Sequence, residues 1–171
     1  MKKILLVFAL STAAMGFAQK GKMGVQFNTG AHLLSEAGTG LTMNAGFTYN
    51  FKPSFGLKLD GGIDLVGQDN LNRLGLQMNL NVISLANKDA KFGLELHAGA
   101  SLVNNGNIMF TDNYLLRGDD MVALMGGITP SYRVSEHLRI LADVTYIPKL
   151  FKIDGYITKY MHATVGVAYN F

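Results

Sequence analysis

Eight ionisable residues stand at alternate positions in segments whose other positions are apolar. They are Lys58, Asp60, Asp64, Arg73, Glu95, His97, Arg139 and Asp143. Without the histidine, three bases face four acids, and charges removed from water are tolerated only when they are paired. We expect Asp64 to pair with Arg73 across one hairpin. The residues expected to form a single network at similar depth are Lys58, Asp60, Glu95, His97 and Asp143.

Two further histidines raise the question of metal binding. His32 and His162 fall on the first and last apolar-alternating segments, which become neighbours if the chain closes on itself. Two imidazoles can begin a metal site, but zinc sites in proteins use three or four ligands. A third ligand is not evident, so hydrogen-bonded interior histidines are the favoured interpretation. We expect neither a metal ion nor another cofactor.

The elements that carry these residues are predicted to be β-strands. From residue 41 to 51, every odd position is apolar and every even position is Thr, Asn or Gly. Such alternation is typical of a strand with two different faces. It recurs eight times, at 23–33, 41–51, 55–65, 74–82, 92–102, 120–132, 138–148 and 160–171. Segment 120–132 is the least regular, because Met121, Ala123 and Met125 place apolar groups on its polar face.

The connections between these segments alternate in length. Residues 52–54, 86–90 and 133–137 form one short set. The other set comprises 34–38, 67–71, 104–119 and 149–159, two of which are long. Bacterial outer-membrane barrels have short periplasmic turns and longer external loops. The sequence therefore predicts an all-β fold, an eight-stranded antiparallel up-and-down transmembrane β-barrel, with both termini on the short-turn side.

Eight alternating strands also fit a soluble barrel, in which the apolar face fills the interior. Three features favour the inverted, membrane arrangement. The polar face is rich in glycine, which suits a crowded interior and weakens a solvated strand. About 12 residues at ~3.3 Å each, tilted by about 40°, cover ~30 Å. The aromatic residues at strand ends next to the short turns form a predicted interfacial girdle: Tyr49, Phe51, Phe55, Phe92, Tyr132, Tyr169 and Phe171. Tyr146 and Tyr160 begin a sparser ring at the other end.

The N-terminus is typical of a secretory signal peptide. Two lysines precede the apolar run 4–10, and small residues lead to a cleavage site near Ala18. Cleavage of residues 1–18 leaves 19–171 as one barrel domain. It also removes two lysines, so 13 bases face 12 acids and the charge falls from +3 to +1. No basic face for nucleic acid is indicated, and the absence of cysteine excludes disulfides.

The last eight residues, Thr164 to Phe171, resemble the β-signal of outer-membrane proteins. Thr164 is the polar residue of this signal, and Gly166 is the glycine two places later. Tyr169 and Phe171 are the hydrophobic residues that end the signal in an aromatic. In architecture the chain resembles small eight-stranded barrels of the OmpA-transmembrane-domain and OmpX kind. The resemblance implies the bacterial outer membrane as location, and the barrel-assembly machinery, periplasmic chaperones, outer-membrane lipid and lipopolysaccharide as partners. We expect a monomer.

The interior network has two interpretations: a polar passage or a salt-bridged plug. Eight strands leave little free bore, which favours the plug. Lipid A deacylases present a Ser–His pair to lipid, whereas His97 and Ser101 point inward, and omptin-like proteases use larger barrels. We therefore expect no enzyme.

The loops at 104–119 and 149–159 carry basic and aromatic residues and are the expected contact surface. The prediction is a structural or surface-interaction barrel, with a narrow channel or a lipid-modifying enzyme as alternatives.

Overall fold

The computed structural model describes residues 23–35, 38–66, 69–104, 109–110, 114–115, 120–153 and 156–171. The predicted signal peptide, residues 1–18, lies outside these ranges. In the described part of the chain, no helix is long and apolar enough to cross a bilayer. The architecture is one of β-strands.

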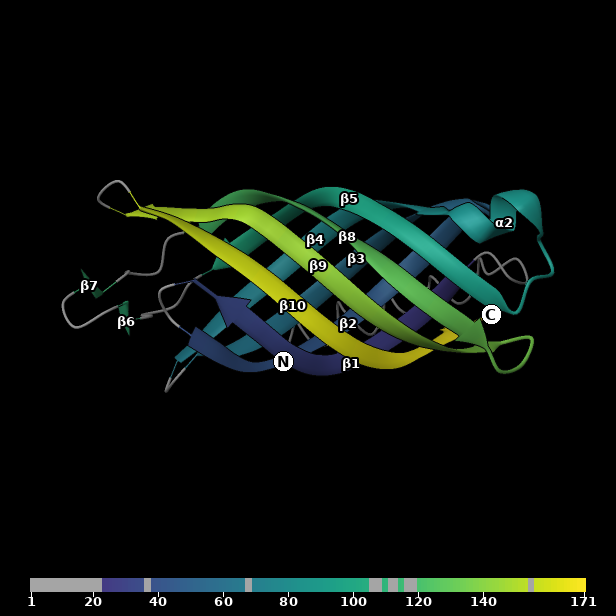
Figure 1. The fold of residues 1–171 in the computed structure, drawn as a ribbon, viewed down its shortest axis with the longest axis horizontal. Coiled ribbons are helices and arrows are strands. Elements are labelled where there is room, and N and C mark those ends of the chain that lie inside the picture. Colours follow the sequence, from purple (N-terminus) through teal and green to yellow (C-terminus); the bar gives the residue numbers. More distant parts are fainter. Residues whose placement is uncertain are drawn as a thin grey trace, which may run out of the picture.

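The strands close into a barrel (Figure 1). They are β1 (Met23–Leu34), β2 (Gly38–Lys52), β3 (Phe55–Val66), β4 (Asp69–Asn81), β5 (Phe92–Asn104), β8 (Asp120–Arg133), β9 (Leu138–Ile153) and β10 (Tyr156–Asn170). All neighbouring pairs are antiparallel, and β1 pairs with β10 from Gly24–Asn170 to Leu34–Tyr160. Every barrel strand is therefore paired on both sides, which removes exposed sheet edges. The predicted eight-stranded antiparallel up-and-down barrel is confirmed.

The two faces of the barrel wall are inverted relative to a soluble protein. Large apolar side chains cover the outside; Phe27, Leu76 and Val165, for example, expose 53, 56 and 63% of their surface. Buried polar and charged side chains fill the inside, among them Asn28, Gln77 and Asp143. A lipid-facing barrel requires this arrangement, with apolar residues outside and polar residues inside. The chain is a transmembrane β-barrel, as the alternation predicted.

Several strands extend beyond their predicted ends. The predicted loop 149–159 is wrong: β9 runs to Ile153, β10 begins at Tyr156, and these two residues pair. The connections predicted at 34–38 and 67–71 shrink to 35–37 and 67–68. Backbone pairing continues past the apolar band, where side chains no longer need to alternate, so the sequence pattern stops before the strand does. Within the predicted loop 104–119, β6 (Met109–Phe110) pairs with β7 (Tyr114–Leu115).

The connection predicted at 86–90 is longer than expected. It spans 82–91 and includes the one-turn helix α2 (Val82–Ala86). The Asn81 side chain accepts a hydrogen bond from the Ser84 backbone N–H at 3.1 Å, which caps this helix. In Figure 1, α2 and the C-terminus lie at one end of the barrel, here called the turn end, and β6 and β7 lie beyond the other, the loop end.

Candidate functional site: the filled barrel interior

The first interior cluster is built around Arg73 on β4. Its Nε donates to Asp64 Oδ2 at 2.7 Å and its Nη2 to Asp64 Oδ1 at 3.1 Å, a two-point contact between adjacent strands. Nη2 also donates to Asn44 Oδ1 at 2.7 Å and Thr42 Oγ1 at 3.2 Å. The guanidinium carbon lies 5.0 Å from the centre of the Tyr160 ring, within cation–π range. The structure thus brings Asp64 and Arg73 together and surrounds them with acceptors.

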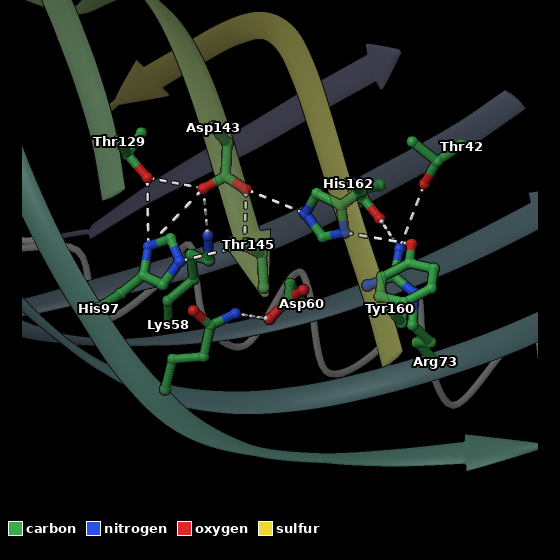
Figure 2. Close-up of polar contacts among 12 residues, drawn as sticks. Thr42, Lys58, Asp60, Arg73, His97, Thr129, Asp143, Thr145, Tyr160 and His162 are labelled. Atoms are coloured by element: carbon green, nitrogen blue, oxygen red, sulfur yellow. Dashed lines mark hydrogen bonds and ion pairs between the residues drawn. The ribbon is translucent and has the colours of Figure 1, made fainter. Parts of the chain in front are cut away.

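The second cluster is centred on Asp143 of β9, which is 2% exposed. Thr129 donates to Oδ2 at 2.6 Å, and Thr145 donates to Oδ1 at 2.8 Å. Lys58 Nζ lies 3.7 Å from Oδ2. The same threonine hydroxyls contact the two ring nitrogens of His97 at 3.2 and 3.1 Å (Figure 2). Several donors therefore replace the water that this carboxylate loses on burial.

Tyr160 and His162 of β10 connect the two clusters. The Tyr160 hydroxyl lies 3.2 Å from His162 Nδ1, and His162 Nε2 lies 3.0 Å from Asp143 Oδ1. Since a carboxylate only accepts, Nε2–H donates to Asp143; in the neutral imidazole, Nδ1 then accepts from the tyrosine hydroxyl. Figure 2 shows this path running across the interior from Arg73, through Tyr160 and His162, to Asp143. Strands far apart in sequence are thereby tied together through side chains.

His32 and His162 lie side by side, but as parts of this network. They are register partners in the β1–β10 pairing. Both His162 nitrogens have hydrogen-bond partners, while His32 Nδ1 lies 3.2 Å from the Leu41 carbonyl and its ring stacks on Tyr160. Among the described residues, no group of three or more His, Cys, Asp or Glu is placed to hold a metal ion.

Glu95 and Arg139 form a separate pair nearer the turn end. Arg139 Nη1 donates to Glu95 Oε1 at 3.1 Å, and Glu95 also accepts from Asn79 at 3.4 Å. Asp60 accepts a 2.5 Å hydrogen bond from Gln77. The single network expected from Lys58, Asp60, Glu95, His97 and Asp143 is therefore divided: Lys58 and His97 contact Asp143, whereas Glu95 pairs across β5 and β9.

An apolar cluster closes the interior toward the loop end. Its buried members are Leu34, Leu71, Val103, Ala123, Met125, Ile147 and Tyr160. This corrects the assignment of Tyr160 to an outer aromatic ring, since it is 1% exposed and faces inward, whereas Tyr146 is 42% exposed. Ala123 and Met125, the irregular residues of the sixth predicted segment, belong to this cluster. Their apolar character therefore serves the interior and does not disturb the strand.

The turn end, in contrast, is hollow. A cavity of about 400 Å³ is lined by residues of the turns and strand ends, including Lys52, Lys91 and Arg133. Below it, a second space of only about 20 Å³ is lined by Glu95, Thr129, Arg139 and other polar residues. The interior therefore narrows from an open mouth to the filled centre.

The predicted girdle residues lie in three groups at the turn end. Their contacts, given as distances between ring centres, are Tyr49–Phe51 at 5.2 Å, Phe51–Phe55 at 5.9 Å, Phe92–Tyr132 at 5.0 Å and Tyr169–Phe171 at 5.4 Å. The first two groups each join the ends of neighbouring strands, and the third lies at the end of β10. Amphipathic and aromatic rings in such positions suit the interface between apolar lipid and headgroups.

The C-terminal motif divides between the two faces of β10. Thr164 is buried in the interior and Gly166 faces Asn28 there, while Tyr169 is exposed on the outside. A Cβ on Gly166 would collide with Asn28 and with the Phe27 carbonyl, so only glycine fits this close approach. The Phe171 backbone N–H donates to the Met23 carbonyl at 2.9 Å. The motif therefore sits at the seam where the first and last strands close the barrel.

The uncharged hydrogen-bond partners of the interior charges were not predicted from the sequence. Thr42, Asn44, Gln77, Thr129 and Thr145 each make a hydrogen bond to Arg73, Asp60 or Asp143. The sequence could have identified them as interior residues, because all of them occupy the polar face of an alternating segment. Which of the many Thr, Asn and Gln residues on that face meet a charge depends on how the strands are staggered.

No model of a protein family and no curated protein matches this chain. Solved structures do match. Neisserial surface protein A (NspA) superposes with a TM-score of 0.65 at 16% identity, covering 87% of this chain and 97% of its own. The N-terminal barrel domain of Pseudomonas aeruginosa OprF gives 0.62 at 15% identity, covering 90% and 100%. The fold is that of the small outer-membrane β-barrels.

A third small outer-membrane barrel is also similar. Ail, the attachment invasion locus protein of Yersinia pestis, gives a TM-score of 0.58 at 13% identity, covering 90% of this chain and all of its own. The three matches cover 87 to 90% of this chain. At such identities the likeness extends to the fold, and the interior network of this chain has to be interpreted from its own residues.

Proposed function

We propose that this protein is a monomeric outer-membrane barrel with a structural or surface-interaction role in the bacterial envelope, and that it is neither an enzyme nor a channel. One observation carries the proposal: the interior is occupied by paired charges around Arg73 and Asp143 and is capped by apolar side chains. A barrel filled in this way offers stability and a surface rather than a path. An eight-stranded barrel has room for little else.

The outer membrane as location is supported by three features. The outer face is apolar, the turn-end aromatic groups suit a membrane interface, and the last strand carries the β-signal residues Thr164, Gly166, Tyr169 and Phe171. Lipid and lipopolysaccharide are then the surrounding partners. The barrel-assembly machinery and periplasmic chaperones are the partners of biogenesis. Cleavage after residue 18 completes this proposal.

The loop end is the proposed contact surface. There β9 and β10 continue as a paired hairpin to Ile153 and Tyr156, and β6 and β7 lie beyond the barrel (Figure 1). Lys149 and Lys159 are exposed on β9 and β10, so basic groups are available to phosphates of lipopolysaccharide or to another acidic surface. One structural neighbour is named Neisserial surface protein A, and another is named attachment invasion locus protein.

A deletion strain tests the role in the envelope. We expect cells that lack the protein to become more sensitive to bile salts and to chelators, and the wild-type gene to restore resistance. The K149Q/K159Q variant separates the two halves of the proposal, since it should restore resistance if the barrel alone supports the envelope and fail if surface contacts do. Unchanged sensitivity of the deletion strain, together with unchanged binding of whole cells to surfaces, contradicts the proposal.

The two alternatives lead to different experiments. A lipid-modifying enzyme needs a nucleophile beside a base, yet Ser101 donates to the Leu102 carbonyl at 3.5 Å and both His97 nitrogens contact threonines. Mass spectrometry of lipid A with and without the protein should therefore give identical spectra. The narrow channel is favoured only by the open turn-end mouth, and conductance tests it.

A further inference from the structure

The turn-end mouth is a hollow without a role in the proposed function. Its volume of about 400 Å³ lies in the range of small-molecule sites. The walls come from the ends of β2, β4, β8 and β10, from the starts of β5 and β9, and from the connections at this end of the barrel, including α2. Figure 1 shows α2 and the neighbouring turns gathered around this end of the barrel.

The charge of this mouth is strongly one-sided. Five bases line it and one acid does: Lys52, Lys88, Lys91, Arg133 and Arg139, with Glu136. Arg139 is neutralised by Glu95 at 3.1 Å. The other four bases make no ion pair with any carboxylate in the described part of the chain. An excess of three positive charges therefore remains around one cavity.

The cavity is closed on its inner side. Asn50, Ser131, Arg139 and Asn170 line both the mouth and the space of about 20 Å³ beneath it, so the two lie next to each other. Beneath them lie Thr129 and the Asp143 cluster, which fill the centre. A ligand can enter this mouth from the turn end and be held there, but the filled centre offers it no exit to the other side.

We propose that the turn-end mouth binds a polyvalent, phosphate-bearing anion. A monovalent carboxylate neutralises only one of the unpaired bases, whereas an oligophosphate meets several at once. Lysine and arginine are the side chains that bind phosphate oxygens most strongly, and the asparagine and serine side chains of the floor add neutral donors. Nothing in this site depends on the role proposed for the loop end.

Two sources supply such a group. One is a soluble oligophosphate from the compartment that the turn end faces. The other is a phospholipid headgroup, because Phe51 and Phe92 line the cavity and also belong to the exposed interfacial aromatic groups. The cavity therefore opens close to the level at which headgroups lie. The shared chemistry is the phosphate, and the source is decided by experiment.

Titration calorimetry with sodium tripolyphosphate tests the proposal on the purified barrel in a nonionic detergent. We expect saturable binding that weakens with added salt. The K88Q/K91Q variant should bind about tenfold more weakly or worse, while K88R/K91R, which keeps both positive charges, should bind as the wild type does. Both side chains are exposed, so heat-modifiable migration on gels should show that both variants fold. No saturable heat, or equal weakening by both variants, overturns the proposal.

A second measurement identifies the source. The titration is repeated in nanodiscs of phosphatidylcholine alone and of phosphatidylcholine mixed with phosphatidylglycerol. Unchanged affinity in the two lipids supports a soluble oligophosphate, and reduced affinity in the anionic lipid supports a headgroup in the mouth. If tripolyphosphate binds in neither nanodisc nor in detergent, the mouth is not a phosphate site.

Discussion

Arg73 on β4 holds Asp64 on β3 through two hydrogen bonds of 2.7 and 3.1 Å, and both side chains are almost fully buried. This pair lies where the polar interior meets the apolar cluster, since Tyr160 belongs to both. The planar fork of arginine fits a carboxylate at two points and so fixes the relative position of the two strands. The interior network is therefore a structural element that joins neighbouring and distant strands.

Removing one member of this pair should be costly. In an R73M variant the Asp64 carboxylate stays buried without its cation, and the expected loss is about 3–5 kcal/mol of unfolding free energy. The R73M/D64L double variant should lose less than R73M alone, because no charge remains uncompensated beside the apolar cluster. Urea unfolding in phospholipid vesicles measures both. If the loss in the double variant equals the sum of the losses in R73M and D64L measured singly, the two residues do not act as a pair.

A glycine beside this pair provides a second test. A Cβ at Gly62 would lie 2.6 Å from Arg73 Nη2 and would also collide with Asn44, whereas a Cβ at Gly61 meets nothing closer than 3.8 Å. G62A should therefore destabilise the barrel by about 1–3 kcal/mol through overpacking. G61A, on the opposite face of the same strand, should stay within about 0.5 kcal/mol of the wild type. If G62A and G61A change the melting temperature equally, the interior accommodates the methyl group at position 62.

The Asp143 cluster predicts a charge-specific effect. D143N leaves the Lys58 ammonium buried without a counter-charge, and about 3–5 kcal/mol should be lost. K58M/D143N should recover part of this loss, since it removes the uncompensated charge. Asp89 is an exposed aspartate in the connection after α2, and D89N should change stability by no more than about 0.5 kcal/mol. Chemical unfolding of the three variants and the wild type provides the comparison; no recovery in the double variant would contradict the ion pair.

The lipid-facing surface can be tested with two similarly exposed leucines. Leu76 on β4 is 56% exposed, and Leu85 on α2 is 62% exposed. If the barrel wall faces hydrocarbon, L76R should cost about 2–4 kcal/mol, whereas L85R at the water-facing turn end should cost about 0.5 kcal/mol or less. Folding equilibria in vesicles measure the difference. Similar small losses for both would indicate that water, and not lipid, covers the barrel wall.

The fold followed from the sequence because period-two alternation is a local property that persists over whole strands. The Asp64–Arg73 contact was also foreseeable, since the two residues flank one tight hairpin. Glu95 with Arg139 was not, because β5 and β9 meet only through the stagger of the closed barrel. The helix α2 escaped notice because five residues carry too little periodicity. The inward position of Tyr160 was not predicted because it is the first residue of its alternating segment; its register partners, Leu34 and Ile147, are apolar residues buried on the inner face.

Conductance across a planar bilayer tests most directly whether the interior is a plug. The purified wild-type protein, with insertion verified by co-flotation with vesicles, is compared with a general porin in the same bilayer. The filled interior predicts a baseline without discrete current steps while the porin conducts. Steady current steps of constant size from the wild-type barrel would contradict the account and establish the narrow channel instead.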